Sequence, residues 1–323
     1  MKKNNSFPRK EFYACTFDSP VNAVNASAID SCGKITHSNF LRNYAEAKWD
    51  VENKGWKSSM IPTALDVHYT EDKLLINCGV TEYKYLLGQF KLALEKNETN
   101  LFESIHGLST EILPLSLDEI FLLQRRTDGI TQHGVDFYDI PTAGQHAGMY
   151  LNQASEKYPG LVKGMLDMDG FPRFNLARHL NLKPEEIGGI DYVGFSRGFE
   201  VSLDSQFNGV TKLNLENMQL IKRAENPGLL LAYRFADILD VFDSLGKKGK
   251  NVKEDLFKNK PVANSLTKGF GIIDDCLGTF LSVLFHKNVV LYTQALGILA
   301  NRGYKVNNKY LSSGKVIKLD DLN

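Results

Sequence analysis

The sequence predicts an α+β protein, and two patterns support this fold class. Short apolar runs bounded by turn residues, which are typical of strands, concentrate between residues 110 and 235. Stretches with apolar residues at three- and four-residue steps, which are typical of helices, dominate the C-terminal part. Residues 1–110 contain both patterns. We therefore expect an N-terminal α/β extension over residues 1–110 and a main domain over residues 111–323 that ends in helices.

The first predicted element is a helix over residues 39–49. Phe40, Tyr44 and Ala47 lie at helical spacing in this segment. Ser38 directly precedes it, and a serine at this position commonly caps a helix by accepting a hydrogen bond from a free backbone N–H. We therefore expect the helix to begin immediately after Ser38.

Two strands and a second helix follow. The apolar runs at residues 64–68 and 73–78 predict strands joined by a tight turn. Leucines and aromatic residues over residues 83–94 predict a helix, for which Thr81 is the expected N-cap. The polar segment 96–100 then predicts a loop that connects to the main domain.

The middle of the chain predicts strands. Residues 119–124 and 190–195 form short apolar runs, and residues 199–203 alternate apolar and polar side chains. The apolar segment 229–235 does not show by its pattern whether it is a strand or a helix. A β-rich core is the expectation for this region.

The C-terminal part predicts three helices, over residues 235–245, 272–285 and 289–300. Gly303 follows the last of them as a natural stop, because glycine readily adopts the left-handed conformation that ends a helix. The charged segment 247–260 predicts a solvent-exposed connection.

The composition indicates a globular, cytoplasmic protein. The chain has 323 residues, of which 43% are hydrophobic and 24% are charged, so it can bury a sizeable core. Lys+Arg and Asp+Glu both number 38, which argues against a dedicated nucleic-acid-binding protein. The four cysteines are scattered, as expected for reduced thiols. No apolar run is long enough for a signal peptide or a membrane span. We therefore expect neither a nucleic acid nor a membrane as partner.

A more specific pattern lies between residues 120 and 195. A strand ends in an arginine pair, a Pro-x-x-Gly-x-x-x-Gly turn follows, and an Ala-Arg-His-Leu sequence comes later. These positions are IFLLQ at 120–124, Arg125, Arg126, Pro141, Gly144, Gly148 and ARHL at 177–180. Their order resembles the Nudix box, the metal-binding loop and helix of pyrophosphate hydrolases. The resemblance implies a mixed sheet in an α/β/α sandwich, with an insert at about residues 150–175.

The resemblance also implies a metal-dependent reaction, but some of the family's metal-binding glutamates have no counterpart in this sequence. Nudix enzymes cleave nucleoside diphosphates linked to another group, and they use Mg²⁺ or Mn²⁺ held by several glutamates. Tyr150 stands where the first glutamate is expected, and His179 stands in place of the glutamate of Arg-Glu-Leu. A second alignment takes Glu185 and Glu186 as the family's Glu-Glu pair, which puts Pro184 inside a helix at a cost of about 3 kcal/mol. We favour the first alignment, because proline followed by two acids is typical of a helix start.

Other residues could replace the missing acids. Asp167 and Asp169 are alternate acids in a glycine-containing turn and are candidate metal ligands, although a solvated turn explains them more simply. His146 and His179 are candidate acids or bases, as are Glu185 and Glu186 in the second alignment.

The candidate ligand-binding residues are mainly arginines and glycines. Arg125, Arg126 and Arg178 could make bidentate contacts to a diphosphate, and Gly144 and Gly148 could let the backbone approach it. A surface salt bridge is the alternative explanation for Arg125 and Arg126.

Three functions remain open from the sequence. We favour a Nudix-like protein that binds a nucleoside-diphosphate-type ligand and has weak or lost hydrolase activity. The second function is an active pyrophosphohydrolase of nucleotide sugars or dinucleotides, which would need Mg²⁺ or Mn²⁺ at a rewired site. The third is a non-catalytic scaffold or regulatory subunit, for which a homodimer is one expected form.

Overall fold

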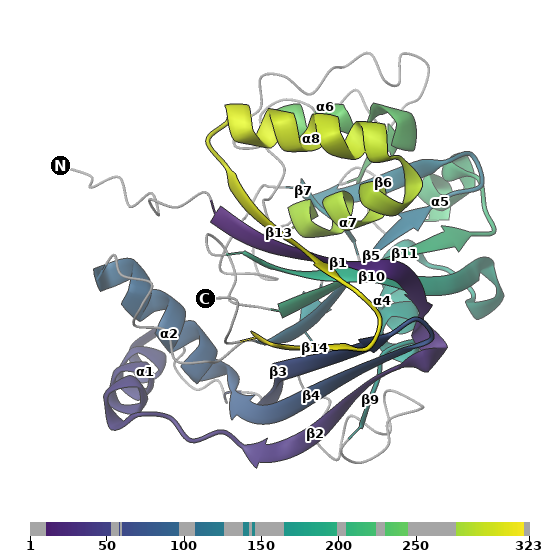
Figure 1. Ribbon diagram of the computed structural model, residues 1–323. Coiled ribbons are helices and arrows are strands. Elements are labelled where there is room, and N and C mark those ends of the chain that lie inside the picture. The colour runs from purple at the N-terminus through teal and green to yellow at the C-terminus, as the bar shows by residue number, and fades with distance from the viewer. Residues whose placement is uncertain are drawn as a thin grey trace.

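The chain folds into two mixed β-sheets and seven α-helices, counted over the residues that the structure describes (Figure 1). The structure is a computed structural model. It describes residues 11–52, 58, 60–96, 107–125, 138–141, 144–145, 165–198, 205–223, 230–244 and 276–319. This mixed α/β architecture confirms the expected fold class at the level of secondary-structure content and sheet type.

The larger sheet, sheet A, combines strands from the whole length of the chain. Its main path runs in the order β12 (Leu230–Arg234), β6 (Ile120–Arg125), β5 (Leu108–Leu115), β11 (Ser205–Leu213), β10 (Ile187–Gly198), β1 (Glu11–Asn22) and β13 (Lys305–Leu311). The β5–β11 and β1–β13 pairs are parallel, and the other pairs are antiparallel. Two short strands, β7 (Tyr138–Asp139) and β8 (Gly144–Gln145), are attached to β6 and β5.

The smaller sheet, sheet B, lies beneath sheet A in the view of Figure 1. Its order is β14 (Lys315–Lys318), β3 (Met60–Thr70), β4 (Lys73–Glu82), β2 (Ala26–Lys34) and β9 (Met165–Asp167). Only the β2–β4 pair is parallel. Both sheets thus contain strands from either side of residue 110, and the expected domain division at that residue stays a prediction.

The helices occupy three positions around these sheets. The outer face of sheet A is covered by α6 (Leu239–Ser244), α7 (Leu277–Lys287) and α8 (Val289–Asn301). Two helices, α4 (Gly170–Leu180) and α5 (Asn217–Arg223), pack into the core between the sheets. A pair formed by α1 (Asn39–Glu52) and α2 (Tyr83–Lys96) lies at one end of sheet B.

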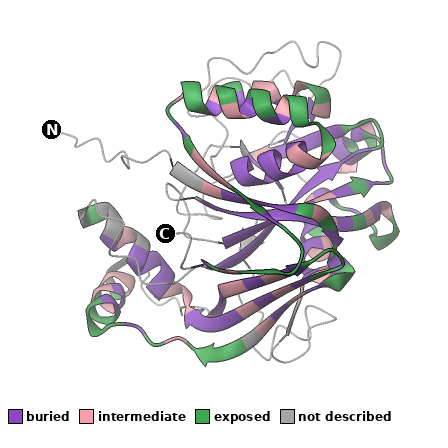
Figure 2. Ribbon diagram, in the orientation of Figure 1, coloured by how far each residue is buried: buried purple, intermediate pink, exposed green. Residues whose placement is uncertain are grey.

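Burial follows this arrangement, as Figure 2 shows by its central band of buried strands. One apolar core fills the space between the two sheets, and a second lies between sheet A and helices α6 to α8. Phe280 belongs to the second core and is 0% exposed. None of the helices in the described part of the chain combines the length and apolarity needed to cross a bilayer.

Most of the predicted elements are present. The predicted N-terminal helix is α1, and the Ser38 hydroxyl accepts a hydrogen bond from the Leu41 N–H at 3.2 Å. The two strands that follow are β3 and β4. The segment at residues 229–235, whose pattern did not distinguish strand from helix, contains the strand β12. Gly303 has the positive φ of 79° that the helix stop requires. The predicted strand at residues 199–203 and the loop at 247–260 lie outside the described residues.

The predicted N-cap of α2 is wrong. Thr81 belongs to β4, and its hydroxyl lies 2.7 Å from Nε2 of His37. Ser58 takes the capping role instead, because its hydroxyl accepts a hydrogen bond from the Lys84 N–H at 2.9 Å. Ser58 lies before β3 in the sequence, so this cap depends on tertiary folding and leaves no local signal near residue 83.

Candidate functional site

Sheet A splits at one end into a fork. Strands β5 and β6 pair with each other at Leu115 and Phe121. Further along, β7 pairs with β6, so that Tyr138 lies opposite Arg125, and β8 pairs with β5, so that Gly144 lies opposite Thr110. The fork places the arginine-bearing strand end and the Gly144 backbone at the same end of sheet A.

The turn inside the fork is closed off from solvent where the structure describes it. Asp139, Ile140 and Pro141 are buried, and the Asp139 carboxylate accepts a hydrogen bond from the Ile140 N–H at 2.8 Å. The predicted site residues Arg126, His146 and Gly148 lie outside the described residues. The structure therefore locates Arg125 and Gly144 within the predicted loop, through their backbones.

Helix α4 carries or adjoins the other candidates. It packs against β5 and β10 on the side of sheet A that faces sheet B. Asp167 and Asp169 lie at its N-terminus, and Arg178 and His179 lie in its last turn. Both α4 and β8 contact β5, so the Arg178 helix and the Gly144 strand share one neighbour in the sheet.

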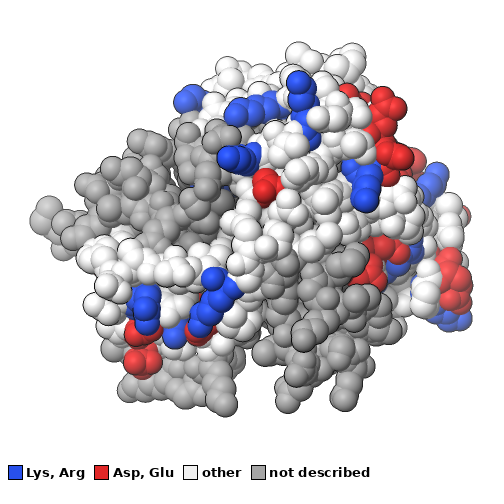
Figure 3. Space-filling view, turned by 60° about the horizontal axis from the view of Figure 1, so that its bottom comes forward, with Lys and Arg blue, Asp and Glu red and all other residues white. Residues whose placement is uncertain are grey.

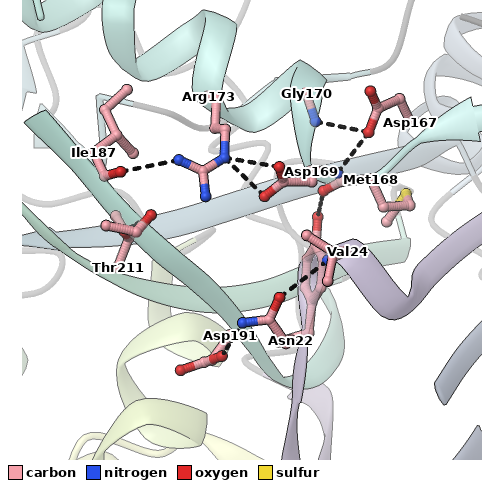
Figure 4. Close-up of polar contacts among 12 residues, drawn as sticks. Asn22, Val24, Asp167, Met168, Asp169, Gly170, Arg173, Ile187, Asp191 and Thr211 are labelled. Atoms are coloured by element: carbon pink, nitrogen blue, oxygen red, sulfur yellow. Dashed lines mark hydrogen bonds and ion pairs between the residues drawn. The ribbon is translucent and has the colours of Figure 1, made fainter. Parts of the chain in front are cut away.

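Asp167 caps the N-terminus of α4 (Figure 4). Its Oδ1 accepts hydrogen bonds from the Asp169 N–H at 3.0 Å and from the Gly170 N–H at 2.7 Å. A Cβ atom on residue 170 would overlap the Asp167 carboxylate, so a larger residue there would displace this side chain. The carboxylate thus satisfies backbone donors that the first turn of a helix leaves free.

Asp169 is held by an arginine from the same helix. Nε of Arg173 donates to both Asp169 oxygens, at 2.9 and 2.8 Å, and Nη1 of Arg173 donates to the Ile187 carbonyl at 3.0 Å (Figure 4). Tyr192 on β10 donates its hydroxyl hydrogen to the Met168 carbonyl at 2.7 Å. Burial, and then the charges of Asp169 and Asp167, raise the pKa of Tyr192 well above its usual value. These contacts fix the turn before α4 to strand β10.

The end of α4 shows whether Glu185 and Glu186, the acids of the second alignment, belong to the same helix as Arg178. The helix ends at Leu180, and Asn181 adopts the left-handed conformation with φ 51°. Pro184–Glu186 forms a separate single turn of 3-10 helix with proline at its start. Glu185 and Glu186 therefore do not continue α4, and the interpretation of Pro184 as a helix start is confirmed.

Glu186 is engaged by neighbouring groups. It accepts a hydrogen bond from the Lys183 N–H at 2.8 Å and two from Nη1 of Arg223, at 2.6 and 2.7 Å. The Lys183 N–H and then the Arg223 guanidinium lower the pKa of this carboxyl. The Glu185 side chain is exposed. Glu186 therefore ties the turn after α4 to the end of α5.

Arg178 and His179 contact each other at the surface. Nη2 of Arg178 lies 3.1 Å from Nε2 of His179, and the guanidinium carbon lies 6.0 Å from the ring centre of Phe174. Arg178 is exposed and faces solvent, so it can reach a bound anion. Among the described residues, no group of three or more His, Cys, Asp or Glu side chains is placed to hold a metal ion.

Sequence reasoning missed a buried polar cluster beside the fork. Glu111 on β5 is 0% exposed and accepts hydrogen bonds from Nε2 of Gln206 at 2.7 Å and from the Thr279 hydroxyl. Asn208 links the same Thr279 to Ser196, at 2.9 and 3.2 Å. The available signal was the run of three polar residues, Ser109, Thr110 and Glu111, in the otherwise apolar sequence LSTEILPL. The cluster fixes α7 to the strands that flank the fork.

A second titratable cluster lies where β1 bulges, between Thr16 and Val21. The Tyr69 hydroxyl donates to Asp18, and Asp18 also accepts a hydrogen bond from the Ser313 N–H at 3.2 Å. The Tyr69 hydrogen bond lowers the pKa of Asp18, while burial and this hydrogen bond raise the pKa of Tyr69 to about 12. Asp18 therefore joins sheet A, sheet B and the turn between β13 and β14.

His286 at the end of α7 predicts a pH dependence of stability. Burial lowers its pKa, although backbone hydrogen bonds to Val193 and Phe17 and the charge of Asp18 oppose this effect. A histidine whose pKa is lower in the folded state stabilises the protein above its unfolded pKa of about 6.5, and this stability is lost as the pH falls. We expect the urea-unfolding free energy to decrease between pH 7.5 and 5.5 less steeply in H286Q than in the wild type.

The control for this experiment is N301Q, which changes an exposed residue at the end of α8 and alters no titratable group. This variant should keep most of the wild-type slope. An unchanged slope in H286Q would contradict the assignment to His286.

The capping role of Asp167 can be tested by D167A. Removing the carboxylate leaves the Asp169 and Gly170 N–H groups without their acceptor, so we expect a loss of about 1 kcal/mol in the free energy of unfolding. Chemical denaturation followed by circular dichroism measures this loss. The exposed Glu185 supplies the control E185Q, whose stability should stay close to that of the wild type. Equal stability of both variants would contradict the capping role.

Comparison with known proteins does not identify a family. The chain matches no protein-family model, and no curated protein resembles it significantly.

Proposed function

We propose that this protein binds a nucleoside-diphosphate-type ligand at a Nudix-like site and that its hydrolase activity is weak or absent. The fork in sheet A is the observation that carries the proposal. It gathers the end of β6 and the Gly144 backbone at one end of the sheet, and α4, which carries Arg178, contacts the same strand β5. The fork thus offers a strand end and a loop backbone to a diphosphate, whereas the end of α4 that carries Arg178 is tied through Asn181 to Arg223.

The chemistry of these groups suits anion binding. An arginine donates in a planar fork that matches two phosphate oxygens, and glycine lets backbone N–H groups come close to them. Arg125, Arg126 and Arg178 supply the positive charge in this proposal, and Gly144 and Gly148 supply the backbone. None of these contacts depends on a metal ion, so ligand binding does not require the missing glutamates.

The acidic side chains near α4 already make structural hydrogen bonds or ion pairs, and this supports weak or absent hydrolysis. Asp167 caps α4, Asp169 pairs with Arg173, and Glu186 pairs with Arg223. Using any of them as a metal ligand would remove a contact that orders α4 or its neighbours. A cleavage reaction without properly placed carboxylates loses several kcal/mol of barrier lowering, which corresponds to orders of magnitude in rate.

Calorimetric titration with ADP-ribose tests the binding proposal. We expect saturable binding in the presence of EDTA, and we expect AMP, which lacks the diphosphate, to bind more weakly. The double variant R125A/R126A should weaken ADP-ribose binding by roughly tenfold or more, because each charged hydrogen bond contributes about 1.5–3 kcal/mol. The exposed Arg42 on α1 supplies the control R42A, which should bind as the wild type does. Absence of binding to ADP-ribose and ADP would overturn the proposal.

A turnover assay tests the catalytic part separately. ADP-ribose, NADH and a nucleotide sugar are incubated with the protein and Mn²⁺ or Mg²⁺, and released mononucleotide is measured. We expect no significant release. Metal-dependent release that D167A or D169A abolishes, while both variants stay folded, would instead establish an active enzyme with a rewired site.

A further inference from the structure

A β-bulge in β3 turns two polar side chains to the outer surface of sheet B. The pairing of β3 with β4 shifts by one residue between Ala64 and Asp66. Ala64 before the bulge, and Val67 and Tyr69 after it, are buried and face the core between the sheets. Without the bulge, the two-residue alternation of a strand would put Asp66 and His68 in that core. The bulge thus places both side chains on the face of sheet B that points away from sheet A.

Asn77 on the neighbouring strand completes a group of three. It lies opposite Asp66 in the β3–β4 pair, and its neighbours Ile76 and Cys78 are buried in the core. Its side chain therefore points to the same outer face as those of Asp66 and His68. The His68 and Asp66 side chains are 43% and 27% exposed, so solvent reaches the group. We call Asp66, His68 and Asn77 the sheet B triad.

The triad brings three side-chain atoms into mutual contact. Oδ1 of Asp66 lies 2.7 Å from Nδ2 of Asn77 and 2.8 Å from Nε2 of His68, and the two nitrogens lie 3.1 Å apart. In an octahedral metal site with bonds of about 2.1 Å, adjacent ligand atoms lie about 3.0 Å apart. Rotation of an asparagine amide about its last side-chain bond exchanges its nitrogen and oxygen, so Oδ1 of Asn77 can take the third position. The triad therefore has the spacing of three adjacent ligands on one side of a metal ion.

The three contacts of the triad cannot all be hydrogen bonds. If Nε2 of His68 carries the hydrogen, it donates to Asp66, and its contact with Nδ2 of Asn77 then joins two donors. If Nε2 carries no hydrogen, its lone pair faces the Asp66 oxygen, and that contact joins two acceptors. A metal cation instead accepts lone pairs from the carboxylate, the imidazole and the amide oxygen together.

We propose that the sheet B triad binds a divalent transition-metal ion through the Asp66 carboxylate, the His68 imidazole and the Asn77 amide oxygen. Water molecules fill the remaining positions. The imidazole disfavours Mg²⁺ and Ca²⁺, which take oxygen ligands, whereas mixed nitrogen and oxygen ligands suit Ni²⁺, Co²⁺ and Zn²⁺. The triad lies on sheet B, apart from the fork in sheet A, so this proposal does not depend on nucleotide binding.

The charges around the triad influence its affinity for a cation. Lys318 on β14 lies opposite Asp66 and is exposed. Its positive charge opposes cation binding, so K318Q should bind Ni²⁺ more tightly than the wild type does. On the face of the molecule that Figure 3 shows, charged side chains of both signs lie in small groups with uncharged surface between them. The proposed binding therefore depends on direct ligands and does not draw on a large acidic surface.

Calorimetric titration with Ni²⁺ tests the proposal on the full-length protein, freed of chelator and without a histidine tag. We expect saturable binding of one ion per chain, with which Zn²⁺ competes and Mg²⁺ does not. H68Q should lower the affinity by roughly tenfold or more, because it removes the nitrogen ligand. The control H179Q removes another partly exposed histidine, on α4, and should keep the wild-type affinity. Absence of saturable binding, or an equal loss in H68Q and H179Q, would overturn the proposal.

The variant N77D separates a metal site from a cluster that only stabilises the sheet. Aspartate at this position supplies a charged oxygen ligand, so the affinity for Ni²⁺ should rise. In EDTA the new carboxylate stands beside that of Asp66, and N77D should melt at a lower temperature than the wild type because like charges repel. Ni²⁺ should then raise the Tm of N77D more than that of the wild type. Weaker Ni²⁺ binding in N77D than in the wild type would show that Asn77 serves only as a hydrogen-bond donor to Asp66, and the metal site would be wrong.

Discussion

Replacing Phe280 with alanine is expected to lower the free energy of unfolding by about 3–5 kcal/mol, the range typical of buried aromatic truncations. Phe280 lies at the centre of the core between sheet A and the C-terminal helices, and it is 0% exposed. Its ring centre lies 5.5 Å from that of Phe121 on β6 and 6.1 Å from that of Phe242 on α6. The truncation therefore removes contacts to two elements and leaves a cavity that a close-packed core cannot fill completely.

Urea denaturation of F280A and of the control V289A measures this difference. Val289 begins α8 and is 60% exposed, so its truncation should change the stability by less than about 0.5 kcal/mol. A loss below about 1 kcal/mol in F280A would show that α7 does not pack on sheet A as described. F280A should also unfold at lower urea concentration than D167A, because a buried aromatic ring contributes more than one helix cap.

The C-terminal helices could be predicted from the sequence because their signal is local. The apolar residues of α7 and α8 repeat at helical spacing, and Asn288 between them caps α8 by accepting a hydrogen bond from the Leu291 N–H at 3.1 Å. Each of these features depends on residues a few positions apart. The same is true of α1 with its cap at Ser38.

The sheet pairings could not be predicted in this way. Strand β1 lies between β10 and β13, so Cys15 is paired with Phe195 on one side and with Lys309 on the other. These partners lie far away in the sequence, and nothing in the local pattern of EFYACTF distinguishes them from other strands. The fork could not be predicted for the same reason. Strands β7 and β8 are two residues long each, and they are defined by their pairing with β6 and β5.

The acids near α4 show why site residues are harder to predict than helices. The sequence DMDG places two acids at alternate positions, which suits both a metal ligand pair and a helix cap. Asp167 in fact accepts hydrogen bonds from N–H groups within three residues of itself, and Asp169 pairs with Arg173 four residues later. Residue type alone did not separate the two roles, whereas the local geometry does.

Replacing Gly278 with alanine is expected to destabilise the protein by about 1–3 kcal/mol, the usual effect of adding an atom to a packed interior. Gly278 lies in the first turn of α7, directly over the buried polar cluster of sheet A. A Cβ atom at this position would overlap the Ser196 side chain and would lie 3.3 Å from Nδ2 of Asn208. The helix would have to move away from the sheet, which would weaken the hydrogen bonds of Ser196, Asn208 and Thr279.

The control for G278A is the same substitution at Gly297, in the middle of α8. Nothing lies within 4 Å of a Cβ atom built at Gly297, and this residue is exposed. Alanine has a higher helix propensity than glycine by about 0.8–1.0 kcal/mol, so G297A should raise the stability. The two variants make an identical chemical change in neighbouring helices, and their effects should have opposite signs in thermal and urea denaturation. Stabilisation by both would mean that α7 does not rest on Ser196, and the close contact between α7 and sheet A would then be wrong.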